Sequence, residues 1–315
     1  RTSSNDEAHK GFSTVEEIYT QIVSDLTTAK SLLADYHPTD LWLINSEICS
    51  GILARVYLVM QNWEGAYNEA KIVYDNHSQL MTREQYRSGF DDMISGNYPE
   101  VVWAMKYTAD NNLGGSTQFN FWYNQDESYG ERTRNANKEI NTKWAFDKYK
   151  HYGEDGGSVI QSATRPEVCL MRGAEMLLIM AEAAAQKGST GEALTLLNRL
   201  QVARNATPTT NGGGDALLED IYKERRKELI CEGQAGFYDL VRLQKRLIRY
   251  GETAANPAGH YVWGMQYLNG YNVSDPQPVG ILESNDYRFF CQIPQMEILN
   301  NDAISEADQN PWSGQ

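Results

Sequence analysis

Two segments of the sequence place aromatic rings beside amide and hydroxyl groups. The first is FNFWYNQD at 119–126, and the second is YVWGMQY at 261–267. A sugar presents a C–H face and a rim of hydroxyl groups, so its site needs flat apolar surfaces next to hydrogen-bonding groups, which Tyr and Trp supply. We interpret both segments as candidate carbohydrate-binding surfaces, although such rings could also alternate into the core face of a strand. The proposed ligand-binding residues are Trp122, Tyr123, Asn124, Tyr129, Trp263, Tyr267 and Tyr271.

Signals for catalysis are weak in comparison. The five histidines are isolated in sequence, and neither an HExxH nor a GxSxG motif is present. A glycosidase needs two carboxylates that face each other across a cleft. Asp126, Glu127 and the pair Glu154-Asp155 could serve, but with 42 acidic residues in the chain such pairs are expected by chance. The sequence therefore favours a protein without catalytic residues, and a glycoside hydrolase is the less favoured alternative.

Metal and cofactor sites are not expected. Asp91-Asp92 and Asp126-Glu127 lack the spacing of a calcium-binding EF-hand loop, and no glycine-rich phosphate loop occurs. The four cysteines lie far apart among apolar neighbours and show no zinc-binding spacing, which predicts buried free thiols. They are Cys49, Cys169, Cys231 and Cys291.

The composition limits the classes of partner. A net charge of −14 argues against a nucleic-acid partner and against adsorption on anionic lipid, because both need a basic surface. The hydrophobic fraction of 41% is ordinary for a globular protein. With 315 residues, the chain is long enough for one large or two modest domains.

Helical periodicity dominates the first ninety residues. Apolar stripes begin at Val15, Leu41 and Trp63, with a capping box expected from Ser13 to Glu16 and an N-cap at Asn62. The short link between the second and third helices forces them to be antiparallel. The pattern returns as helices over 168–186 and 190–204, the latter opened by a capping box from Ser189 to Glu192. The helix pairs resemble tetratricopeptide units without a strict period.

The segment 225–242, RRKELICEGQAGFYDLVR, predicts two helices with a tight glycine-containing joint. The apolar period of the second helix runs from Phe237 to Leu247. Arginines beside glutamates near such a joint suit a partly buried ion-pair lock, since a guanidinium can bind a carboxylate through two hydrogen bonds. A solvated charged surface is the alternative, and the spacing alone does not choose between them.

The predicted fold class is mainly α, with irregular tetratricopeptide-like helix pairs, a long loop-rich insertion and a loop-rich C-terminal tail. The helical frame comprises 13–89 and 165–250, the insertion 90–164 and the tail 251–315, all within a single domain over 1–315. Strand-like runs are expected in the insertion, one of them over 101–105. A loop-rich insertion of this length in a helical frame suggests a function.

Four segments, in order, resemble the SusD/RagB family of outer-membrane nutrient-binding lipoproteins from Bacteroidetes. They are ILARVYLVMQNWEGAYNEA at 52–70, LMRGAEMLLIMAEAAAQKG at 170–188, the segment 225–242, and FFCQIPQMEILNN at 289–301. The third matches the pattern RR-x-EL-x-x-EG-x-x-x-[FY]-DL-x-R. Its signature positions are Arg225, Arg226, Glu228, Glu232, Gly233, Asp239 and Arg242.

The resemblance implies a surface-exposed protein of the cell outer membrane that binds a nutrient glycan without cleaving it. It further implies delivery of the glycan to a SusC-like TonB-dependent transporter, with membrane contact only through an N-terminal lipid anchor that this sequence does not contain. The resemblance begins in the middle of the family pattern, so we expect a fragment. A tetratricopeptide-type scaffold that binds a protein segment is the alternative from another functional class.

Overall fold

The computed structural model describes residues 11–88, 98–105, 168–230, 232, 235–250, 278–284 and 286–310. The chain divides into two compact units, one over 19–235 and the other combining 1–18 with 236–315. Each unit is described by itself below, and the single domain expected from the sequence stays a prediction.

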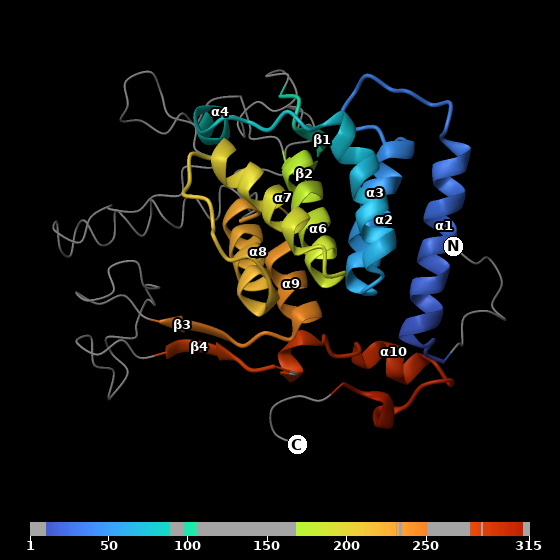
Figure 1. Ribbon diagram of the computed structural model, residues 1–315. Helices are drawn as coiled ribbons and strands as arrows, with labels where there is room; N and C mark the ends of the chain where they lie inside the picture. The colour runs from blue at the N-terminus through green and yellow to red at the C-terminus, as the bar shows by residue number, and fades with distance from the viewer. Residues whose placement is uncertain are drawn as a thin grey trace, which may run out of the picture. The chain divides into compact units, whose positions relative to one another are not determined.

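The larger unit is built from antiparallel helix pairs. Figure 1 shows the helices α2, α3, α6, α7 and α8 of this unit packed side by side, which confirms the predicted mainly α fold class. The helices are α1 (Val15–Leu32), α2 (Ser46–Val59), α3 (Trp63–Asn76), α4 (Arg83–Ser88), α6 (Gly173–Gln186), α7 (Thr190–Ala203) and α8 (Gly214–Glu228).

Helix α6 forms the centre of the core. Every residue from 173 to 184 is buried, and the helix packs against α2, α3, α7 and α8. A helix that is apolar around most of its circumference must be covered on all sides. Two charged residues nevertheless lie inside this run, Glu175 and Glu182, and both are buried.

The link between α2 and α3 follows the prediction closely. Residues 60–62 connect the helices, and the side chain of Asn62 accepts a hydrogen bond of 3.0 Å from the backbone N–H of Gly65. The predicted apolar stripe begins at Leu41, but the helix begins only at Ser46, so the first part of that stripe lies outside α2. Its buried positions are Ile48, Cys49, Ser50, Gly51, Leu53, Ala54 and Leu58.

Both predicted capping boxes require correction. At the start of α1 the box joins Thr14 to Glu17, one residue later than expected, through bonds of 2.8 Å and 3.1 Å. At the start of α7 the side chain of Ser189 makes no capping bond. Glu192 instead accepts a hydrogen bond from the hydroxyl of Tyr67 in α3, and burial together with this carboxylate raises the pKa of Tyr67 to about 12.

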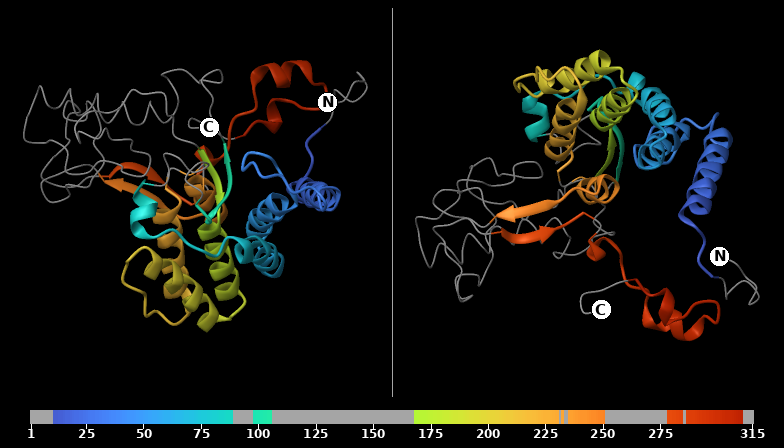
Figure 2. Two further views of the ribbon diagram at one scale, coloured as in Figure 1. Left: turned by 90° about the horizontal axis from the view of Figure 1, so that it is seen from above. Right: turned by 60° about the horizontal axis from the view of Figure 1, so that its bottom comes forward.

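The predicted strand over 101–105 is confirmed as β1 (Val101–Met105), but the predicted helix over 168–186 is wrong at its start. Residues 168–172 form β2 (Val168–Arg172), which pairs antiparallel with β1. Figure 2 shows the two strands side by side next to α6. Glycine is required where β2 meets α6, since an ideal Cβ at Gly173 would lie only 2.1 Å from the backbone oxygen of His77.

The smaller unit contains α9 (Ala235–Leu243), β3 (Leu247–Tyr250), β4 (Pro278–Leu282), the 3-10 turns η4 (Tyr287–Phe289) and η5 (Glu306–Asp308), and α10 (Gln295–Asn300). Strands β3 and β4 pair antiparallel. The two predicted helices around the glycine-containing joint are confirmed as α8 and α9, but Leu247 begins β3 instead of continuing the helical period. The short helices of the tail agree with its prolines.

None of the described helices is both long and apolar enough to cross a membrane. Cys49 and Cys169 are free and buried as predicted, whereas the prediction of a buried thiol is wrong for Cys291, which is free but exposed in the irregular segment before α10. Cys231 lies outside the described residues.

We expect Gly173→Ala to lower the free energy of unfolding by about 1–3 kcal/mol, because the added methyl group would collide with the backbone oxygen of His77. Gly191→Ala is the matched control, since Gly191 also lies in the first turn of a helix but has open space around its Cβ position. The free energy of unfolding of Gly191→Ala should rise by about 0.5–1 kcal/mol. Urea unfolding measures both, and equal effects would contradict the steric argument.

Candidate functional site

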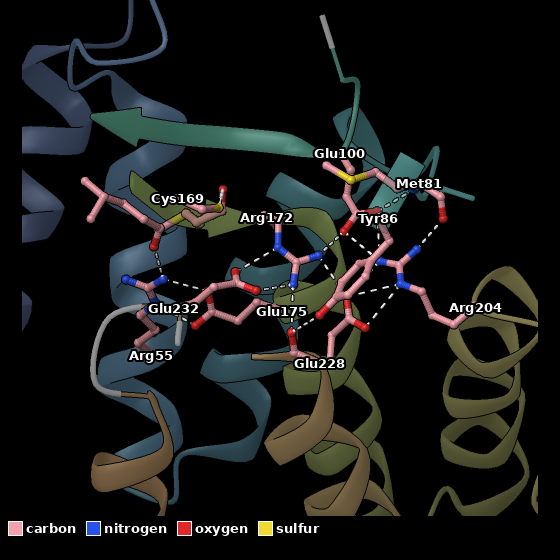
Figure 3. Close-up of polar contacts among 12 residues, drawn as sticks. Arg55, Met81, Tyr86, Glu100, Cys169, Arg172, Glu175, Arg204, Glu228 and Glu232 are labelled. Atoms are coloured by element: carbon pink, nitrogen blue, oxygen red, sulfur yellow. Dashed lines mark hydrogen bonds and ion pairs between the residues drawn. The ribbon is translucent and has the colours of Figure 1, made fainter. Parts of the chain in front are cut away.

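The described part of the larger unit gathers five charged side chains in its interior. They come from the turn before β1, the end of β2, the residue after α7, the last residue of α8 and the joint after it (Figure 3). Their side chains have exposures between 0% and 9%. We call this set the buried charge cluster, and it consists of Glu100, Arg172, Arg204, Glu228 and Glu232.

Arg172 occupies the centre of the cluster. Its Nε and Nη2 atoms bind the two carboxylate oxygens of Glu232 at 2.8 Å and 2.6 Å, the bidentate geometry that strengthens such pairs. Its Nη1 atom donates to Glu228 at 2.8 Å and also to Glu100. Burial alone would lower the pKa of this guanidinium, but the three surrounding carboxylates raise that pKa well above its usual value.

Arg204, the residue after α7, binds two of the same carboxylates from another side. Its Nη2 atom lies 2.7 Å from Glu228 and 2.9 Å and 3.0 Å from the two oxygens of Glu100. Its Nη1 atom donates to the carbonyl oxygen of Met81. Glu100 also accepts a hydrogen bond from the backbone N–H of Met81. The N–H and the carbonyl oxygen of Met81, which precedes α4, are therefore both bound by cluster side chains.

Tyr86 of α4 covers the cluster. The guanidinium carbon atoms of Arg204 and Arg172 lie 4.8 Å and 5.6 Å from the centre of its ring, within cation–π range. Its hydroxyl donates a 2.8 Å hydrogen bond to the backbone oxygen of Glu228. Burial, with the nearby carboxylates, raises the pKa of Tyr86 far above its ordinary value, so the ring stays neutral at physiological pH.

A second ion pair lies beside the cluster. Arg55 of α2 binds the carboxylate of Glu175 through two bonds of 2.6 Å and 2.7 Å, and it also donates to the carbonyl oxygen of Leu170 in β2. Helix α2, strand β2 and the first turn of α6 are therefore held by one guanidinium (Figure 3).

The role that this arrangement supports is to hold backbone segments in place. The cluster carboxylates are bound by guanidinium groups and removed from water, so they are poorly placed to exchange protons with a substrate. Glu100 directly precedes β1 and Arg172 ends β2, the two strands that flank residues 106–167 along the chain. The cluster therefore ties the start of β1 and the end of β2 to the ends of α7 and α8.

The signature residues of the segment 225–242 divide into two groups. Glu228 and Glu232 are held in buried ion pairs, but their partners are Arg172 and Arg204, which come from other segments. Arg225 is buried as well, and its part in the predicted ion-pair lock stays a prediction. Arg226 is exposed, as the alternative of a solvated surface predicted. Asp239 and Arg242 form a pair of their own at 2.7 Å within α9. Gly233 lies outside the described residues.

The sequence reasoning missed Glu100 and both arginines that bind the signature glutamates. One signal was present: Arg172 interrupts an otherwise apolar run, and a charge in such a run is tolerated only when it is paired. Nothing comparable marks Glu100 or Arg204, because each lies at the edge of an apolar run and not inside it, where a charged residue is also expected at the surface.

The proposed ligand-binding residues all lie outside the described residues, so their contacts stay predictions. These are Trp122, Tyr123, Asn124, Tyr129, Trp263, Tyr267 and Tyr271. Within the described ranges, no group of three or more His, Cys, Asp or Glu side chains could hold a metal ion.

We expect Arg172→Met to destabilise the protein by about 3–5 kcal/mol, since it leaves three buried carboxylates with one remaining guanidinium. The difference in unfolding free energy between the variant and the wild type should become smaller as the pH falls, because a carboxylate without its cation is protonated more readily in the folded state. Lys187→Met is the matched control, because its ion pair with Glu64 is exposed to solvent and should contribute little to stability. Urea unfolding at pH 5 and pH 7.5 measures both, and equal losses would contradict the prediction.

Comparison with known proteins identifies a matching family and several similar proteins. The SusD family model matches residues 103–312. SusD-like protein P38 from Formosa agariphila is 34% identical over 110 residues, a match that covers 32% of this chain and 22% of that protein. The match thus spans only about a fifth of this curated relative.

Solved structures share the fold. A SusD-like carbohydrate binding protein from Bacteroides vulgatus ATCC 8482 has a TM-score of 0.68 and 26% identity, over 99% of this chain and 70% of that one. A SusD superfamily protein from Bacteroides thetaiotaomicron VPI-5482 has a TM-score of 0.68 and 25% identity over the same shares. Surface glycan-binding protein A from Bacteroides uniformis, at 18% identity, has a TM-score of 0.55 over 94% of this chain and 69% of that one. Since the family match extends over more than half of the sequence, the chain belongs to the SusD family.

Proposed function

We propose that this chain binds a nutrient glycan without cleaving it. The observation that carries the proposal is its 26% identity, over 99% of its length, with a solved structure described as a SusD-like carbohydrate binding protein. Membership of the SusD family supports the same function.

The surfaces of the helix pairs argue for a glycan over a bound protein segment. A groove that binds a peptide presents exposed aromatic anchors on its helices. In the described parts of α2, α3, α6, α7 and α8, the exposed large hydrophobic residues are Val59, Ile72 and Val202, none of them aromatic. The aromatic-rich sequences are 119–126 and 261–267, which therefore remain the candidates for stacking against sugar rings.

The state of the carboxylates supports binding without cleavage. A glycosidase needs one protonated acid and one ionised carboxylate that both reach the substrate. The buried carboxylates of the cluster are all engaged by guanidinium groups. The acidic residues that the sequence offered as an alternative, Asp126, Glu127, Glu154 and Asp155, lie outside the described residues.

The rest of the proposal concerns the cellular role. A member of the SusD family that binds a glycan would deliver it to a SusC-like TonB-dependent transporter at the surface of the cell outer membrane. A lipid anchor that precedes this sequence would be its only contact with the membrane. Loss of glycan uptake after deletion of the gene, with uptake restored by the full-length gene, would support this role.

We expect Trp122→Ala and Trp263→Ala each to weaken glycan binding by about tenfold, the effect of losing one stacked ring and its buried area. A glycan array probed with the wild-type protein first selects the oligosaccharide, and titration calorimetry then measures each variant. Tyr36→Ala is the control, because Tyr36 is an exposed ring outside both aromatic-rich segments.

Two results would count against the proposal. Wild-type affinity in both tryptophan variants would remove these positions from the site while leaving glycan binding intact. No binding across the array, or release of reducing ends from a bound oligosaccharide, would contradict non-catalytic glycan binding itself.

A further inference from the structure

A histidine that the buried charge cluster does not use lies against the turn that leads into β1. His77 is the residue after α3, and its side chain is 19% exposed. Its Nδ1 atom lies 2.8 Å from the backbone oxygen of Pro99, and its Nε2 atom lies 3.3 Å from a carboxylate oxygen of Glu47 in the first turn of α2. One imidazole thus joins α2, α3 and the turn over 98–100.

Both atoms that face the ring are acceptors that carry no hydrogen. A neutral imidazole has one N–H group and can satisfy only one of them, whereas an imidazolium has two N–H groups and satisfies both. The observed geometry therefore fits the protonated ring. The end of α3 adds to this preference, because the C-terminal end of a helix favours a positive charge.

The charged group that faces the ring is Glu47. The amide of Asn76, at the end of α3, donates a 2.8 Å hydrogen bond to the other oxygen of this carboxylate and so orients it. The turn contributes the carbonyl oxygen of Pro99, and α6 approaches the backbone of His77 at Gly173. Burial alone would lower the pKa of His77, but the bonds to Glu47 and Pro99 raise it above its ordinary value. In return, hydrogen bonds from His77 and Asn76 outweigh burial and lower the pKa of Glu47.

The turn that His77 holds is a junction in the fold. Glu100, next to Pro99, accepts a 2.8 Å hydrogen bond from the N–H of Gly173 through its backbone oxygen. Its side chain enters the buried charge cluster, and β1 begins at the following residue. The carbonyl group that His77 binds therefore lies two residues before the start of β1.

We infer that His77 is a proton-controlled clasp, which fastens the turn over 98–100 to α2 and α3 when its ring is charged and loosens that turn when the ring is neutral. The sign follows from linkage, since the folded state binds the proton more tightly than the unfolded chain. The stabilisation is complete below about pH 6.5, the ordinary value for histidine, and is lost as the pH rises through the higher pKa of the folded protein. The clasp is independent of which ligand the protein binds.

Nitrogen-15 NMR of the imidazole groups tests the protonation directly. The signals that disappear in His77→Gln belong to His77. At pH 6 both ring nitrogens of His77 should be protonated. The midpoint of its titration should lie above the ordinary pKa of a histidine side chain. Glu47→Gln should move that midpoint downward, because it removes the facing charge. One protonated nitrogen at pH 6, or a midpoint that Glu47→Gln leaves unchanged, would overturn the inference.

Hydrogen exchange tests the effect on the turn. After correction for intrinsic rates, protection of the hydrogen-bonded amides of β1 should fall roughly tenfold between pH 6 and pH 8.5 in the wild type, the effect of one charge-assisted hydrogen bond. His77→Gln should show no such fall, and His37→Gln, which alters an exposed histidine, should behave as the wild type. The same fall in His77→Gln as in the wild type would overturn the clasp, whatever the glycan-binding assays show.

Discussion

A buried charge must be paired, and this requirement organises the larger unit. Arg172 and Glu100 have side chains without solvent exposure, so any partner that failed to reach them would leave an ion uncompensated in the interior. Their partners arrive from the ends of α7 and α8 and from the joint after α8. Segments far apart in the sequence can satisfy these charges only in one arrangement. Desolvation of these charges offsets much of their attraction, so the cost of losing one partner exceeds the net stabilisation that the intact cluster provides.

The cluster also explains how an apolar helix can end inside the protein. Helix α6 is buried along most of its length, and its N-terminal end meets β2 at Arg172. The positive end of a helix beside a buried arginine would be unfavourable without compensating carboxylates. The three carboxylates of the cluster supply that compensation for Arg172, and Glu175 in the first turn binds Arg55. Apolar packing thus holds the helix along its length, and ion pairs hold the strands and turns at its end.

The sequence predicted what local periodicity and capping determine. The α2–α3 pair, the N-cap at Asn62, the strand over 101–105 and the two helices around the glycine-containing joint follow from neighbouring residues. The start of α6 was wrong, since residues 168–172 become a strand only because β1 lies beside them, and periodicity carries no information about that partner. For the same reason the cluster could not be predicted from the sequence. The glutamates at 228 and 232 were recognised, but the arginines that bind them come from distant segments. The proposed glycan contacts depend on residues beyond the described ranges and stay untested.

The spacing of Glu228 and Glu232 shows how a short sequence pattern can encode a tertiary contact. Glu228 is the last residue of α8, and Glu232 follows in the joint. Residues four apart in a continuous helix would lie on one face of it. Because α8 ends at Glu228, the carboxylates of Glu228 and Glu232 can bind different nitrogens of the Arg172 guanidinium. The backbone oxygen of Glu228 is left to accept from both Tyr86 and Arg172. The end of α8 is therefore a requirement of the pairing, because a helix that continued through residue 232 would use this carbonyl for its own hydrogen bond and withdraw it from the cluster.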